Sequence, residues 1–306
     1  MNLPGLLLIL CCLAGARAMA MDLRIEPARA NCDQDTPPPP EPPAAAAQRI
    51  PESQAVAGSR GLAWVWLADP TRRYPHGALG SGVHAGSVQA LAVAAPGAAP
   101  QTVRYTLPLH RVFEDRVPRL VDLDQDGRDE ILLIEADALR GAALVLLGLR
   151  WTATGPELFE QARGPYAGTS FRWLNPVGVA DFDGDGRLDV ASVTTPHVGG
   201  VLTLHHVRPP DLVPFAKAMD VSNHRMGALE QRLAVIVHQP PARPAIVVPD
   251  MTRQALQALR WEAPGRWQEM PAVQPMPALV ERLLPLPQGA CALLADGSHW
   301  RVTLLP

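Results

Sequence analysis

Two short acidic segments, 59 residues apart, constrain this chain more than any other feature of its sequence. Residues 121–136 read VDLDQDGRDEILLIEA and residues 180–195 read ADFDGDGRLDVASVTT, so both follow the pattern D-x-D-x-D-G-R-x-[D/E]. Carboxylates that alternate at this spacing converge in a tight loop, where they would repel one another. A hard cation with many oxygen ligands removes that repulsion, so the pattern predicts two calcium sites.

The predicted ligands are the side chains at positions 1, 3, 5 and 9 of each loop and the backbone carbonyl at position 7. The glycine at position 6 permits the sharp turn that brings position 7 round. Mg²⁺ is less suited, because it takes fewer protein ligands and keeps its water. The predicted ligand residues are Asp122, Asp124, Asp126, Arg128 and Glu130 in the first loop and Asp181, Asp183, Asp185, Arg187 and Asp189 in the second.

An EF-hand is the first alternative to test, because it also carries alternating acidic residues. Its loop ends in a bidentate Glu at position 12, between two helices. Position 12 is Leu133 in one segment and Ser192 in the other, and the runs 131–134 and 190–195 favour β-structure. We therefore expect each loop to join two strands, with a metal-free acidic hairpin as the remaining alternative.

The strand–loop–strand frame recurs once more, without the carboxylates. Apolar runs at 233–236 and 246–248 flank a loop whose four side-chain ligand positions are Val237, Gln239, Pro241 and Ala245. A period of 50–60 residues with several short strands per unit is typical of a β-propeller.

At these residues the chain resembles the FG-GAP and VCBS-type repeat β-propellers, whose calcium loops have the form D-x-D-x-D-G-x-x-D. The resemblance is strong over residues 117–200 and weaker over 201–260. The segments 174–178 and 221–225 are similar to recurring elements of secreted bacterial members, whereas a full Phe-Gly…Gly-Ala-Pro pair is missing. The resemblance implies an all-β propeller with calcium. Integrin-like members use this fold as a binding platform.

Strand-like runs predict about five four-stranded blades, with four to seven possible. The units are 60–110, 111–165, 166–225, 226–276 and 277–306. The last unit is too short for four strands, so a strand from the N-terminal side is expected to complete it. That closure would suit a bridge between Cys32 and Cys291, although two unpaired thiols remain the alternative.

Residues 1–18 are expected to be a secretory signal peptide. The apolar run at 3–14 is too short to span a bilayer, and Ala16-Arg17-Ala18 is a small-x-small cleavage site. Cys11 and Cys12 leave a lipoprotein as the alternative. Residues 19–58, rich in Pro and Ala, are expected to be an extended linker, and residues 59–306 the propeller. We expect a periplasmic or secreted protein without a transmembrane segment.

Composition narrows the possible partners. The 33 prolines and 24 glycines argue against a mainly helical protein. The net charge of −3, without basic runs, argues against nucleic-acid binding. Two Ca²⁺ ions, four charges together, would move the formal charge from −3 to +1.

Two functions are compatible with these features. The first is a binding or scaffold module with structural calcium, whose ligand is an unidentified protein or glycan and whose oligomeric state is open. The second is a propeller enzyme, a lyase or hydrolase acting on a glycan or phosphoester. We find no familiar catalytic motif in the sequence, and the adjacent His205 and His206 would point to opposite faces of a strand. Polar residues gathered from several blades at one mouth would favour the enzyme, and a loop-covered mouth the binding module.

Overall fold

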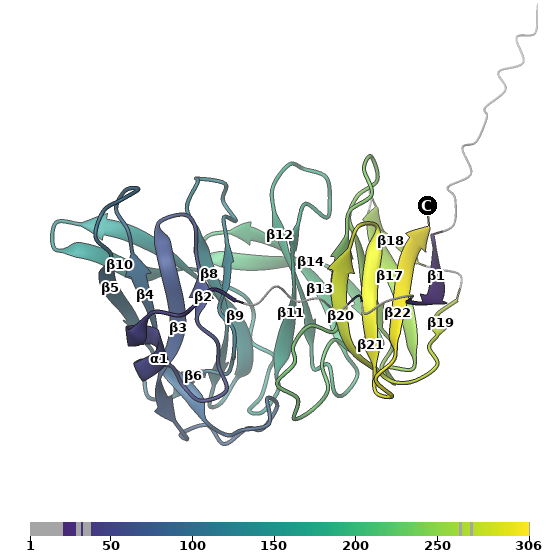
Figure 1. Cartoon of the computed structure of the whole chain (residues 1–306), viewed down its shortest axis with the longest axis horizontal. Coiled ribbons are helices and arrows are strands. Elements are labelled where there is room, and N and C mark those ends of the chain that lie inside the picture. Colours follow the sequence, from purple (N-terminus) through teal and green to yellow (C-terminus); the bar gives the residue numbers. More distant parts are fainter. Residues whose placement is uncertain (1–20, 29–31, 33–37, 263–264, 270–271, 306) are drawn as a thin grey trace, which may run out of the picture.

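A computed structural model of the chain describes residues 21–28, 32, 38–262, 265–269 and 272–305, and these residues are folded mostly as β-strands (Figure 1). The predicted signal peptide lies outside the described residues. Antiparallel pairing groups most strands into five units of four strands, which we call blades 1 to 5. The all-β fold and the expected number of about five blades are thereby confirmed.

The first three blades follow one another along the chain. Blade 1 consists of β2 (Val56–Ala57), β3 (Leu62–Thr71), β4 (His84–Ala92) and β5 (Gln101–Thr106). Blade 2 consists of β7 (Arg119–Val121), β8 (Glu130–Asp137), β9 (Gly141–Thr152) and β10 (Gly155–Arg163). Blade 3 consists of β11 (Leu174–Ala180), β12 (Asp189–Thr194), β13 (Val201–Arg208) and β14 (Asp211–Met219).

The last two blades complete the molecule. Blade 4 consists of β15 (Val235–Val237), β16 (Ala245–Pro249), β17 (Ala255–Glu262) and β18 (Arg266–Glu269). Blade 5 consists of β20 (Val280–Leu286), β21 (Gly289–Leu294), β22 (His299–Leu305) and β1 (Asp22–Pro27). Two short strands supplement the blades: β6 (Arg111–Phe113) pairs with β4 and β8, and β19 (Gln274–Pro275) pairs with β17. The hydrogen-bonded sheets have 4, 13 and 5 strands, because β6 and the β10–β14 bridge join blades 1 to 3.

Blade 2 shows how the blades bury their faces. Strand β8 is buried at every position because neighbouring blades cover both of its sides. Ile131 and Leu133 belong to the apolar cluster shared with blade 1, whereas Leu132 and Ile134 belong to the cluster shared with blade 3. Successive side chains of a strand point to opposite faces, so a strand between two blades is an unbroken apolar run.

The segment predicted as a linker, residues 19–58, contributes two elements to the fold. Strand β1 pairs antiparallel with β22 and supplies the fourth strand of blade 5, which confirms that an N-terminal strand completes this unit. Its sequence DLRIEP alternates apolar and polar residues, with Leu23 buried and Ile25 packed against the same core. The proline-rich stretch that follows obscured this short strand signal.

The second of these elements, helix α1 (Pro43–Gln48), covers one face of blade 1. Ala44 and Ala45 pack against Trp66 and Ala68 of β3, on the face opposite to the core shared with blade 2. In Figure 1, blade 1 (purple) and blade 5 (yellow) stand on opposite sides of the molecule. A disulfide joins Cys32 to Cys291 of β21, with a Cα–Cα distance of 5.7 Å, so the bridged alternative is the correct one.

Candidate metal centres

Both acidic segments form the first hairpin of a blade. The first joins β7 to β8 in blade 2, and the second joins β11 to β12 in blade 3. No helix flanks either loop, so the EF-hand alternative is wrong. Carboxylate oxygens converge in each loop, where one ligand atom per residue lies within 4.8 Å of the others. The two groups are Asp122, Asp124 and Glu130, and Asp181, Asp183 and Asp189.

The glycine at position 6 shapes both loops in the same way. Gly127 and Gly186 have φ angles of 87° and 85°, a left-handed backbone that glycine adopts without steric cost. Their backbone N–H groups donate to the position-1 carboxylates, with N–O distances of 3.1 Å to Asp122 and 3.0 Å to Asp181. The turn therefore fixes the carboxylate at position 1.

The carboxylate at position 9 closes each loop from the following strand. The N–H of Leu123 donates to Glu130 Oε2 at 2.8 Å, and the N–H of Phe182 donates to Asp189 Oδ2 at 3.1 Å. Both acids are buried, with residue exposures of 4% and 1%. A buried carboxylate that faces other carboxylates needs a positive counter-charge or a proton.

Positions 5 and 7 lie on the exposed part of each loop. Asp126 Oδ1 accepts a hydrogen bond from the N–H of Arg128 at 2.8 Å, and Asp185 Oδ1 accepts one from the N–H of Arg187, also at 2.8 Å. Neither Asp126 nor Asp185 belongs to the two convergent groups of the described residues. Their role as ligands and that of the two arginine carbonyls remain predictions.

The electrostatics of the loops suit a bound cation. Burial, reinforced by Asp124, Asp126 and Asp122, raises the pKa of Glu130 to about 7, although the N–H of Leu123 opposes the shift. Burial also raises the pKa of Asp189 to about 6, against the hydrogen bonds from His206 and Phe182. Asp122 Oδ1 is buried without a hydrogen-bond partner. An oxygen-rich group with an unsatisfied carboxylate oxygen is the donor set that Ca²⁺ prefers.

Each loop also has a basic neighbour that the sequence did not reveal. In the first, Arg60 Nη1 lies 2.6 Å from Asp122 Oδ2. In the second, His206 Nδ1 lies 3.0 Å from Asp189 Oδ1, and its ring stacks on Phe215. His205, on the other face of β13, lies 3.2 Å from the carbonyl oxygen of Val190 through its Nδ1, as the alternation predicts. Partners such as Arg60 are 62 residues away in sequence, so no local signal could identify them.

Loops from several blades cover a buried polar cluster at the end of the blades opposite to the acidic loops. Asp115 Oδ1 and Asn175 Oδ1 accept hydrogen bonds from Gln231 Nε2, and Asn175 Nδ2 donates to the backbone carbonyl of Asn223. Loop 72–83 meets the loop that follows β14 where the N–H of Gly227 donates to the carbonyl of Ala78 at 2.8 Å. Polar residues from several blades do gather here, which is the arrangement expected of an enzyme. Loops cover them, however, which is the arrangement expected of a binding module.

One further acid–base pair lies in this region. Glu114 is fully buried, and its Oε1 lies 2.7 Å from Nδ1 of His76, which is partly exposed. Burial raises the pKa of Glu114, while His76 and Arg116 oppose the shift. No local pattern in the sequence indicates this pair, because the two residues are 38 positions apart in unrelated segments.

Comparison with known proteins agrees with the loop geometry. Residues 122–192, from the first aspartate of one loop to the strand after the other, match the FG-GAP-like repeat family. No curated protein matches the chain. Among the described residues, no helix has the length and apolar character needed to cross a membrane. Residues 122–192 are therefore similar to an FG-GAP-like repeat, and this matched stretch contains both acidic loops.

Proposed function

We propose that this chain is a calcium-stabilised β-propeller that acts outside the cytoplasm as a binding or scaffold module. The observation that carries the proposal is the convergence of three carboxylates in each of two loops with matching hydrogen bonds. Ca²⁺ would neutralise these groups, and the residues that would hold it are the ten predicted ligands. Its contribution is electrostatic, because the loops already have the turn that the site requires.

The position of the loops supports a structural role for the ion. Each loop is the first hairpin of a blade, and its position-9 acid is the first residue of a strand whose neighbours fill the inter-blade cores. Repulsion among unneutralised carboxylates would strain the start of β8 and of β12. Calcium bound only to the folded state would stabilise the fold by about 3 kcal/mol per site at one hundred times Kd.

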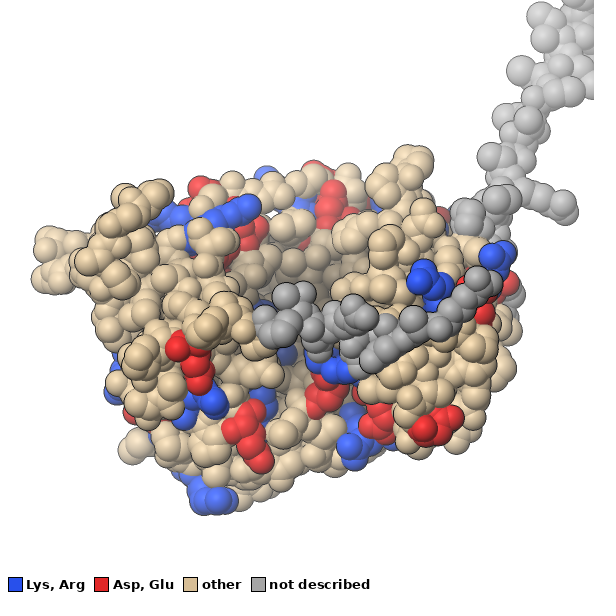
Figure 2. Space-filling view, viewed as in Figure 1, with Lys and Arg blue, Asp and Glu red and all other residues tan. Residues whose placement is uncertain are grey.

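A binding module is favoured over an enzyme because the mouth of the polar cluster is covered. Asp115, Asn175 and Asn223 are buried, and their side chains form hydrogen bonds with Gln231 or with backbone carbonyls, so they are not exposed to a substrate. Figure 2 shows acidic and basic side chains interspersed on the face in view. A ligand recognised through specific contacts suits such a surface better than one attracted by net charge.

Thermal unfolding of the full chain tests the calcium sites. Calcium at about 5 mM should raise the midpoint relative to EGTA, because weak extracellular sites have Kd values up to about 10⁻³ M. The shift should disappear in Asp124→Ala/Asp183→Ala and persist in Asp211→Ala, which removes one exposed carboxylate outside the loops. A midpoint unchanged by calcium in the wild type would refute the calcium sites. Fractionation of the producing cells, with N-terminal sequencing of the mature chain, tests export and cleavage after residue 18.

A further inference from the structure

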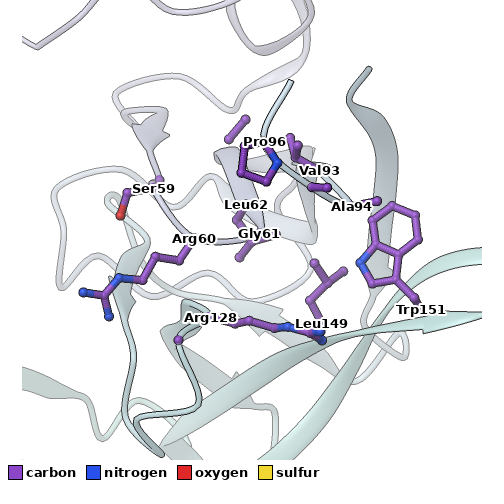
Figure 3. A pocket seen from close by; sticks show the side chains of 14 residues that line it. Ser59, Arg60, Gly61, Leu62, Val93, Ala94, Pro96, Arg128, Leu149 and Trp151 are labelled. Carbon is purple, nitrogen blue, oxygen red and sulfur yellow. The ribbon is translucent and has the colours of Figure 1, made fainter. Parts of the chain in front are cut away.

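A solvent-open cavity of about 480 Å³ lies beside the first acidic loop (Figure 3). Its walls are the β2–β3 turn at residues 58–63, the β4–β5 turn at residues 93–96, residues 127–128 of the acidic loop, and Leu149 and Trp151 of β9. The cavity thus lies between blades 1 and 2, and its volume is within the range of ligand sites, about 300–1,000 Å³.

The charged groups of the cavity all have one sign. Arg60 and Arg128 are the only charged residues among those that line it. In Figure 3 Arg128 extends below Leu149, while Trp151 stands at one end of the cavity and Arg60 at the other. Arg60 is already paired with Asp122. The side chain of Arg128, in contrast, forms no ion pair with any residue that the structure describes, so its guanidinium can take an anionic ligand.

The remaining lining groups suit a ligand with one apolar face and several hydroxyls. Leu149, Leu62 and the partly buried indole of Trp151 form an apolar surface. Ser59, an exposed residue of the turn at residues 58–63, adds a side-chain hydroxyl to the lining that can pair with a ligand hydroxyl. Aromatic rings present a flat, apolar face beside a polar handle.

We propose that this cavity binds a carboxylate-bearing saccharide, a uronate, with its carboxylate on Arg128 and a sugar face against Trp151. A planar guanidinium takes a carboxylate through two parallel hydrogen bonds, which a neutral sugar cannot offer. A neutral saccharide would leave the guanidinium of Arg128 unused, so the site selects for the acid form.

The cavity is also tied to the first acidic loop, and this part of the inference rests on the proposed calcium site. Asp129 Oδ2 accepts hydrogen bonds from the N–H groups of Ser59 at 3.1 Å and Arg60 at 3.0 Å, and the Asp129 N–H donates to the Arg60 carbonyl at 2.9 Å. These hydrogen bonds connect the first acidic loop directly to the cavity wall. Calcium would add two positive charges beside Arg128 and so favour an anionic ligand.

Tryptophan fluorescence titration with a β-1,4-linked triglucuronate tests the proposal on the full chain. The control ligand is cellotriose, a β-1,4-linked trisaccharide without carboxylates. Triglucuronate should bind at least ten-fold more tightly than cellotriose in calcium. Arg128→Ala should weaken its binding about ten-fold, the effect of losing a charged hydrogen-bond donor. Arg266→Ala is the control, because Arg266 is an exposed arginine that pairs with Glu262 on the surface and does not line the cavity. Trp151→Leu, which keeps apolar volume, should weaken both ligands.

The outcomes separate this proposal from the calcium proposal. Loss of triglucuronate binding in EGTA, with Arg128 dependence in calcium, supports both the site and its coupling. Binding that depends on Arg128 but is equal in EGTA and calcium supports the saccharide site and overturns the coupling. No saturable binding, or equal binding by Arg128→Ala and Arg266→Ala, overturns the site even where calcium raises the unfolding midpoint.

Discussion

His197 Nε2 lies 2.8 Å from His224 Nδ1, and His224 Nε2 lies 3.0 Å from the carbonyl oxygen of Ala228. A carbonyl only accepts, so the proton of His224 is on Nε2, and its Nδ1 must accept from His197. This assignment applies to the neutral form of His224, which burial favours by lowering its pKa, and a second proton on His224 would remove the Nδ1 acceptor.

This pair predicts that the protein loses stability in mild acid. Burial, together with the charge of the neighbouring imidazole, lowers the pKa of His224 to about 3, and burial lowers that of His197 to about 4. Because the unfolded state takes up protons near pH 6.5, stability is lost as pH falls from 6.5 toward these values. Between about pH 7 and pH 5 the loss from His224 should be about 2 kcal/mol. Urea unfolding of wild type and His224→Phe at both pH values measures it. Equal losses in the two proteins would contradict the prediction.

Calcium binding at the first loop should release protons near neutral pH. The pKa of Glu130 is raised to about 7 in the metal-free protein, so the ion displaces a proton from a partly protonated group. Calorimetric titration at about pH 6.5, in buffers that differ in ionisation enthalpy, should give buffer-dependent heats. Glu130→Gln should lose this dependence together with the site. In EGTA the effect of Glu130 on stability runs opposite to that of the histidines. Its raised pKa stabilises the fold at low pH, and that stability is lost as pH rises from 4.5 through about 7. Buffer-independent heats for the wild type would exclude proton displacement.

Breaking the disulfide should loosen the attachment of the N-terminal segment to blade 5. Cys32 and Cys291 are separated by 259 residues, so the bridge closes nearly the whole described chain. Its loss should lower the free energy of unfolding by about 3 kcal/mol, since a bridge over a long loop restricts the unfolded state most. Chemical denaturation of wild type and Cys32→Ser/Cys291→Ser, both under oxidising conditions, provides the measurement. Equal midpoints would show that the pairing of β1 with β22 holds the N-terminal segment to blade 5 unaided.

In blade 4 the guanidinium of Arg260 contacts the loop that corresponds to the acidic loops of blades 2 and 3. The loop between β15 and β16 lacks carboxylates, and Arg260 donates to the carbonyl of Arg243 and to the side chains of Gln239 and Gln268. Arg260→Leu should therefore cost about 2 kcal/mol with or without calcium and leave the calcium stoichiometry at two. The exposed Arg266 is the control, because Arg266→Leu removes only a surface ion pair with Glu262. A calcium-dependent cost of Arg260→Leu would mean that this loop also binds the ion.

The strands and blades could be predicted because their signals are local. The β-favouring run of β12 and the apolar run of β8 each extend over a few adjacent residues, and the loop period of 59 residues is visible without any structure. The convergence of Asp122 with Glu130 follows from the same short range. The sites assembled from distant segments were missed, as with Gln231 and Asp115, which are 116 residues apart. Such pairings depend on how blades turn about one another, which no short window of sequence records.

The pairing of β1 with β22 fixes an order of events during synthesis. Residues 22–27 emerge from the ribosome long before residues 299–305, yet each strand is the other's partner. Blades 1 to 4 can therefore assemble as the chain grows, while blade 5 stays open until its last strand has been translated. A stop at any codon before residue 299 would leave β1 without its partner and the apolar side chain of Leu23 exposed to the solvent.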